Sequence, residues 1–179
     1  RYVASETKDE YTRQELPDSF PYYVFSQYSW GAHCCFNILL IRKDEPHKVS
    51  HYWDNLDSQP CVGDANDDGE FEMFINDYSY PYWPYSFAAS PAPRLILRIT
   101  PTGFSLAPDL MIEPPLDDAT LQKKLDEIAA QINDDSNYME YNIYAAEREK
   151  YVPYELYATM LDLIYSGNEK LAWAFLEKV

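Results

Sequence analysis

The sequence predicts an α+β fold, in which an antiparallel β-sheet of five to seven strands is followed by a C-terminal helical part of three to four helices. Short extended runs rich in aromatic and β-branched residues follow one another from residue 22 to about residue 107. No helical period separates these runs, and this favours antiparallel pairing. After Pro114 and Pro115 the apolar residues change to a helical spacing.

The pattern divides the chain into three regions. Residues 1–21 form a polar N-terminal arm, residues 22–115 an antiparallel β region, and residues 116–179 a helical region. Each expected helix carries an apolar stripe that must be buried against another part of the chain. We therefore expect the helical region to pack on the β region as one unit.

The β region contains six clear strand candidates. The second is apolar on both faces, which indicates a central strand. In the fourth, alternate apolar residues share one face. The six runs are Tyr22 to Ser29, Cys35 to Arg42, His47 to Trp53, Phe71 to Asp77, Arg94 to Thr100 and Phe104 to Ala107.

Three amphipathic stripes predict helices in the C-terminal region. The first starts after an N-cap at Asp117 or Asp118 and runs to Ile132. The second starts at Pro153, which suits a first helical turn, and stops at Gly167. Asn168 is the expected N-cap of the third. Residues 138–150 form a weaker helix candidate.

One loop of the β region has the spacing of a calcium site. Calcium takes six to eight hard oxygen ligands, which carboxylates, amide side chains and backbone carbonyls supply. A glycine at the sixth position permits the sharp bend of such a loop. The pattern D-x-N-x-D-G-x-x-E predicts a Ca²⁺ site with ligands Asp64, Asn66, Asp68, Glu70 through its carbonyl, and Glu72.

The loop differs from an EF-hand, because Ile75 stands at the twelfth position, where that motif needs a bidentate glutamate. An apolar strand follows instead of a helix. In both respects the segment from Cys61 to Ile75 resembles the calcium loops of FG-GAP and VCBS-type β-propeller blades. Those loops usually carry aspartate where this one has Glu72. A single copy does not imply a propeller.

Longer stretches are similar to an uncharacterised family of exported bacterial proteins. They are Gly31 to Phe36, Tyr82 to Pro93, and the tail from Leu163 to Leu176. The resemblance spans most of residues 30–179. It implies a periplasmic or secreted location and implies nothing about activity. A start at Arg1 agrees with a processed chain.

The net charge of −16 restricts the partners. Phosphate backbones would be repelled, which argues against nucleic-acid binding. No apolar run approaches the roughly 18 residues of a membrane span.

The sequence contains three cysteines, and their bonding state has several possibilities. In an exported protein we expect one disulfide, between Cys61 and either Cys34 or Cys35, with one thiol left over. The alternatives are three reduced, buried cysteines, or a metal or redox role.

The segment from Tyr78 to Phe87 holds six aromatic residues and two prolines in ten positions. Exposed, such a stiff run would stack on sugar rings or grip a peptide. The alternative is that most of the ring area is buried as cover for a sheet edge. The residues of the hypothetical ligand surface are Tyr80, Tyr82, Trp83 and Tyr85.

These observations favour an exported, calcium-stabilised binding or interaction module whose ligand is an unknown protein or carbohydrate. The alternative is a hydrolase with an unrecognised acidic or Cys–His site. Neither a G-x-S-x-G motif nor a phosphate loop nor a dinucleotide fingerprint occurs in the sequence, so a binding role is favoured over an enzymatic one.

Overall fold

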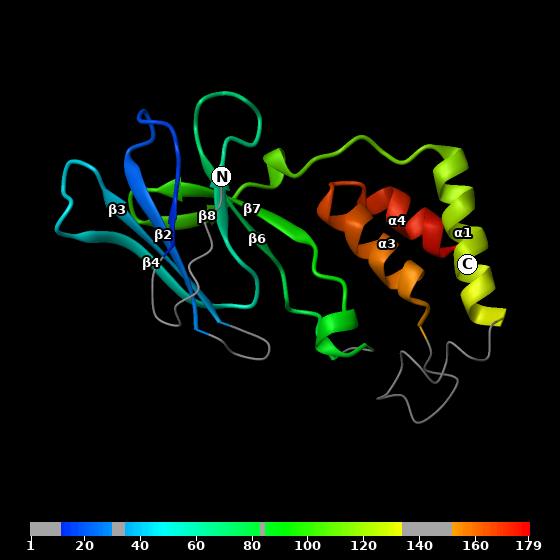
Figure 1. The fold of residues 1–179 in the computed structure, drawn as a ribbon. Helices are drawn as coiled ribbons and strands as arrows, with labels where there is room; N and C mark the ends of the chain where they lie inside the picture. The colour runs from blue at the N-terminus through cyan, green and yellow to red at the C-terminus, as the bar shows by residue number, and fades with distance from the viewer. Residues whose placement is uncertain (1–11, 30–34, 83–84, 134–151) are drawn as a thin grey trace. The chain divides into compact units, whose positions relative to one another are not determined.

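The computed structural model describes residues 12–29, 35–82, 85–133 and 152–179 (Figure 1). The chain forms two compact units. The first comprises residues 1–76 and 94–110, and the second comprises residues 77–93 and 111–179. The aromatic segment therefore belongs to the same unit as the helices.

The first unit holds two antiparallel sheets, each of four strands in the described residues. The strand orders are β1-β2-β3-β4 and β5-β6-β7-β8. The bounds are β1 Thr12–Gln14, β2 Tyr22–Tyr28, β3 Phe36–Arg42, β4 Val49–Leu56, β5 Cys61–Gly63, β6 Glu72–Asn76, β7 Arg94–Thr100 and β8 Gly103–Leu106.

The α+β class is confirmed, but the expected count of five to seven strands is wrong, because the described residues contain eight. The two additional strands, β1 and β5, have three residues each. A run of three residues is too short to show a period of two. The single expected sheet is also two sheets, since β4 and β5 do not pair.

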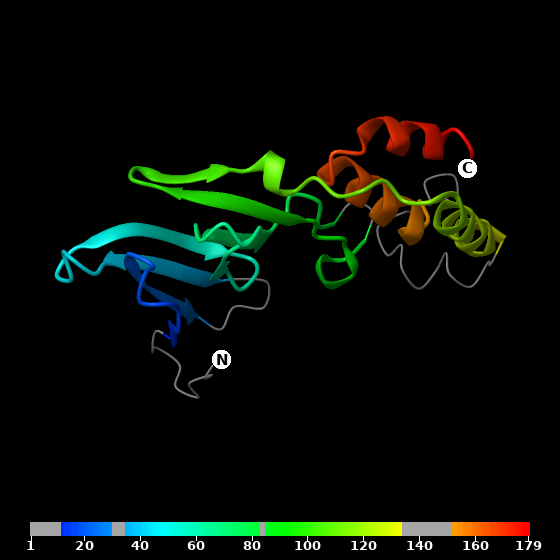
Figure 2. The ribbon, with the colours of Figure 1, turned by 90° about the horizontal axis from the view of Figure 1, so that it is seen from above.

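The two sheets pack face to face as separate layers of the first unit (Figure 2). Alternation along each strand sends one set of side chains inward. Val24, Ile38 and Leu40 from the first sheet are almost fully buried, as is Met73 from the second. One apolar core joins both layers; its buried members are Phe20, Val24, Ile38, Leu40, Leu56, Val62, Met73, Ile75 and Leu97.

Two polar links also connect the sheets. The side-chain amide of Gln14 in β1 pairs with the backbone of Val62 in β5: Nε2 donates to the carbonyl at 2.5 Å, and Oε1 accepts from the amide at 2.9 Å. Nε2 of His51 in β4 lies 2.6 Å from the carbonyl oxygen of Thr100 in β7. Both links add hydrogen bonds between the sheets to the apolar contacts of the core.

The second unit contains the helices α1 (Asp118–Asn133), α3 (Tyr154–Tyr165) and α4 (Glu169–Leu176). The expected helix at residues 138–150 lies outside the described residues. As predicted, Asp117 caps α1: its Oδ1 accepts the Thr120 amide at 2.7 Å.

The turn between α3 and α4 follows the predicted helix stop. Gly167 has φ +76°, a conformation that glycine adopts at low cost. Asn168 precedes α4 as expected, but its side chain does not cap the helix. It donates instead to the carbonyl of Glu113 at 3.0 Å, and so ties the turn to the strand-to-helix connection.

Candidate metal centre and aromatic segment

The predicted calcium loop connects β5 to β6 at one edge of the second sheet. Two of its residues have left-handed backbone: Asp67 at φ +59° and Gly69 at φ +88°. Aspartate and glycine are among the residues that tolerate this region. The two residues reverse the chain within a few positions, and the loop closes on itself.

Asp64 organises the interior of the loop. Its Oδ1 accepts the amides of Asn66 at 3.3 Å and Asp68 at 3.1 Å. Its Oδ2 accepts the amide of Gly69 at 2.8 Å. The carboxylate of the first predicted ligand therefore points into the turn rather than into solvent.

Asn66 and Asp68 lie beside this carboxylate. The Asp68 amide that reaches Asp64 also lies 3.4 Å from Oδ1 of Asn66, so oxygens of two predicted ligands meet at one N–H. Asn66 Nδ2 donates to Asp68 Oδ2 at 2.9 Å. The Glu70 amide donates to Asp68 Oδ1 at 2.8 Å, and this bond, with that from Asn66, lowers the pKa of the Asp68 carboxyl.

Glu72 is the buried member of the set. Its side chain opens β6 and is 2% exposed, and its Oε2 accepts the Ala65 amide at 3.2 Å. Burial raises the pKa of the Glu72 carboxyl, and the negative charges of Asp68 and Asp64 raise it further. A buried carboxylate beside two others is a place where a cation relieves repulsion.

One described cation acts on the loop: Arg98 stands opposite Glu72 in the β6–β7 register. Its positive charge acts on both Glu72 and Asp68. Its guanidinium is held by Asp109 through a two-pronged ion pair, with one N–H···O distance of 2.7 Å. Sequence reasoning missed Arg98 and Asp109, because only the strand register places Arg98 opposite Glu72, and only the ion pair with Arg98 links Asp109 to it.

Among the described residues, no group of three or more His, Cys, Asp or Glu side chains converges closely enough to hold a metal ion. Backbone amides occupy oxygens of Asp64, Asp68 and Glu72. Carboxylate and amide oxygens are the donors that calcium prefers, so the chemistry of the set fits that ion.

Tyr85 does not belong to a ligand surface, and its assignment to one was wrong. It is 1% exposed, and its hydroxyl donates to the carbonyl of Val152 at 2.5 Å. Its ring stacks on that of Tyr157 in α3. A large ring with one polar atom is buried readily when that atom has a partner.

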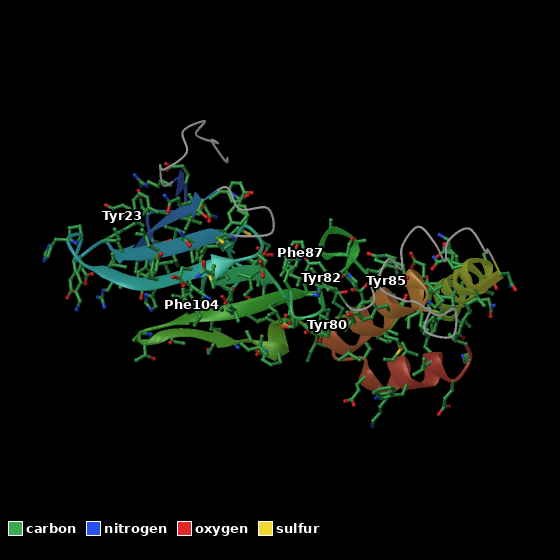
Figure 3. All side chains as sticks on the ribbon, turned by 90° about the horizontal axis from the view of Figure 1, so that it is seen from below. Tyr23, Tyr80, Tyr82, Tyr85, Phe87 and Phe104 are labelled. Atoms are coloured by element: carbon green, nitrogen blue, oxygen red, sulfur yellow. The ribbon has the colours of Figure 1, made fainter. Side chains whose placement is uncertain are left out.

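The other aromatic residues of the segment differ in exposure; Tyr80, Tyr82 and Phe87 are labelled in Figure 3. Tyr80 is half-buried, and its hydroxyl lies 3.0 Å from that of Tyr165. The Tyr165 hydroxyl in turn donates to Asp77 at 2.5 Å. Tyr82 is 48% exposed and has φ +64°. Trp83 lies outside the described residues.

The expected bridge through Cys61 is wrong. Cys61 in β5 carries a free thiol, whereas Cys35, which precedes β3, is disulfide-bonded. Cys61 faces Phe74 across the second sheet, while Cys35 adjoins a strand of the first. Burial raises the pKa of the Cys61 thiol, so little of it is the nucleophilic thiolate at neutral pH. Cys34 lies outside the described residues.

Comparison of the chain with models of protein families, with curated proteins and with solved structures finds no match.

Proposed function

We propose that the protein is a periplasmic or secreted, calcium-stabilised module that binds a protein or carbohydrate ligand. The observation that carries the proposal is the buried carboxylate of Glu72 beside the charges of Asp64 and Asp68. Arg98, whose positive charge acts on Glu72, is paired with Asp109. A divalent ion would offset the charge that the loop concentrates.

The side chains of Asp64, Asn66, Asp68 and Glu72, with the carbonyl of Glu70, would hold the ion. Bound calcium would supply a fixed positive charge that joins the start of the loop to the first residue of β6. An ion that binds only the folded chain adds RT ln(1 + [L]/Kd) to the free energy of unfolding. Its role in this proposal is therefore stability and not chemistry.

The test is thermal unfolding of the whole chain with excess calcium and with a calcium chelator. We expect a higher Tm with calcium and a lower one with chelator. Asp68→Asn should remove this difference in Tm, because it replaces a charged ligand of the ion with a neutral one. Asp67→Asn is the matched control: it removes the same charge from the neighbouring residue, whose backbone conformation asparagine also tolerates. Equal melting curves with calcium and chelator contradict the proposal.

Tyr82 is the described residue of the aromatic segment that best fits a ligand surface. Its half-exposed ring offers an amphipathic face of the kind that stacks on sugars and packs on peptides. Tyr82→Asn keeps a residue that accepts positive φ and removes the ring. Screening both proteins against immobilised glycans and peptides should give binding that the variant loses while its Tm is kept.

The export expectation rests on the resemblance described above, and cell fractionation of a strain that expresses the full-length gene tests it. The described residues include no helix long and apolar enough to cross a membrane. The hydrolase alternative gains no support from Cys61, because the raised pKa of its thiol is the opposite of what a nucleophile needs.

A further inference from the structure

The strand β3 is apolar on both of its faces, as the sequence predicts. Ile38 and Leu40 belong to the core between the two sheets. Side chains alternate along a strand, so Leu39 and Ile41 lie on the opposite, outward face of the first sheet. An antiparallel sheet with one face in solvent normally carries polar residues on that face. The two outward residues of β3 therefore need a separate explanation.

Strand pairing extends the apolar surface across three strands. Each of the two outward residues of β3 stands opposite one apolar residue of β2 and one of β4. Residues that stand directly opposite each other share a face of the sheet. The resulting outer patch consists of two rows, Phe25–Leu39–Tyr52 and Tyr23–Ile41–Val49.

The outer patch is open to solvent on its β4 side. Tyr52 is 53% exposed and Val49 is 49% exposed. The other four residues are half-buried, and none of the six belongs to an apolar core of the described residues. Tyr23 is labelled in Figure 3. A contiguous apolar patch on the surface of a soluble protein commonly marks an interaction site.

The charges at the outer patch differ from those of the whole chain. With a net charge of −16, two copies repel each other on average. The two rows of the patch contain no carboxylate, and two cations contact Tyr23: the guanidinium of Arg13 at 4.9 Å and Nζ of Lys43 at 5.7 Å from the ring centroid. Glu15, 4.0 Å from Arg13, offsets part of that charge. A second acidic copy therefore meets less repulsion at this face than the net charge implies.

The size of the face is that of a weak interface. The strands β2, β3 and β4 have seven, seven and eight residues. With standard strand spacing and rise, they present a flat area of roughly 350 Å² per copy, or about 700 Å² for two copies. Stable interfaces bury about 1,000 Å² or more, so we expect reversible association with a Kd on the order of 10–100 μM.

We propose that the outer patch is a self-association surface, through which two copies of the chain pack sheet against sheet. Two apolar sheet faces are complementary, as in the core between the two sheets of the first unit. Two-fold packing needs only one such surface on each copy. The aliphatic residues Leu39, Ile41 and Val49 offer no hydrogen bond to a sugar, so a second protein surface fits the patch better than a glycan. The proposal does not depend on the calcium loop.

The test is sedimentation equilibrium of the whole chain from about 1 μM to about 500 μM, a range that brackets the expected Kd. Tyr52→Glu should raise the dimer Kd about tenfold or more, because two-fold symmetry places the added charge in the interface twice. Trp173→Glu is the matched control. Trp173 lies on α4, outside the patch, and is 52% exposed, so the same substitution there should leave the dimer Kd unchanged.

Two further measurements make the test independent of a single variant. Val49→Glu changes the other row of the patch and should weaken the dimer as Tyr52→Glu does; circular dichroism confirms that each variant is folded, since an edge strand tolerates a charge. Raising NaCl from about 0.15 M to about 0.5 M should tighten the dimer, because salt screens the repulsion between the copies.

The proposal is overturned if the wild type stays monomeric over the whole concentration range. It is also overturned if either folded patch variant keeps the wild-type dimer Kd, if Trp173→Glu weakens the dimer as much as they do, or if high salt dissociates the dimer.

Discussion

Glu72 and Arg98 stand directly opposite each other on β6 and β7, yet the salt bridge of Arg98 is with Asp109 and not with Glu72. The buried carboxylate thus has a cation near it but not bonded to it. Under the calcium proposal, Glu72 is not committed to an ion pair with Arg98, and the charge of Arg98 would influence how tightly the loop holds an ion.

Under the calcium proposal, Arg98→Gln should tighten calcium binding about two- to fivefold, because it removes the positive charge that acts on Glu72 and Asp68. Titration calorimetry measures the change in Kd. Arg94→Gln is the control, since Arg94 lies on the same strand with its guanidinium over the ring of Phe74. The gain should shrink at high salt. Weaker binding by Arg98→Gln would show that the arginine supports the site instead of competing with the ion.

Tyr165→Phe should lower the free energy of unfolding by about 1–3 kcal/mol, because it removes the hydrogen bond to the half-buried Asp77. Chemical unfolding at pH 7 measures this loss. Tyr154→Phe removes a more exposed hydroxyl from the same helix and should cost less.

The contribution of the Tyr165–Asp77 hydrogen bond to stability should also depend on pH. Burial alone would raise the pKa of Asp77, but hydrogen bonds from Ser79 and Tyr165 hold it below its ordinary value. A lowered pKa contributes stability that is present above about pH 3.9 and is lost as the pH falls through the folded value. The difference in the free energy of unfolding between the wild type and Tyr165→Phe should therefore become smaller in strong acid. A constant difference down to pH 2 contradicts this reading.

The phenol of Tyr157 should ionise at a higher pH than that of an exposed tyrosine. Burial, with a smaller contribution from Tyr80, raises its pKa to about 12. The unfolded phenol ionises near 10, so the stability that neutral Tyr157 contributes is complete below pH 10 and is lost between pH 10 and 12. Phenolate absorbance and circular dichroism measure ionisation and unfolding together. The stability of Tyr157→Phe should fall less than that of the wild type as the pH rises from 10 to 12. An equal loss of stability in the two proteins argues against the raised pKa.

Alkylation should label Cys61 slowly and leave Cys35 unlabelled until a reductant is added. The Cys61 thiol is free but half-buried and has a raised pKa, and Cys35 is disulfide-bonded. Peptide mass spectrometry of the native chain identifies the labelled cysteine. Label on Cys35 before reduction would contradict the structure.

Residues whose role is local were predictable. The strand at Arg94–Thr100 has the expected bounds, Asp117 caps α1, and Gly167 ends α3 with positive φ. Each of these signals depends on a short stretch of chain, through side-chain alternation or backbone freedom. The turn at Gly69 belongs to the same group.

Features that depend on register were not predictable. The Gln14 contact with Val62 joins residues 48 positions apart, and Arg98 reaches Glu72 only through strand pairing. The prediction of a ligand surface in the aromatic segment was wrong at Tyr85 for a related reason. Tyr82 and Tyr85 have the same chemistry in sequence, and only packing against α3 distinguishes the buried ring from the exposed one.

The most direct test of the central claim is calorimetric titration of the whole chain with calcium, in a buffer first treated with chelating resin. The account predicts one binding event per chain that Asp68→Asn abolishes and Asp67→Asn preserves. Heat of binding that is absent from the wild type, or that survives in Asp68→Asn, would contradict it.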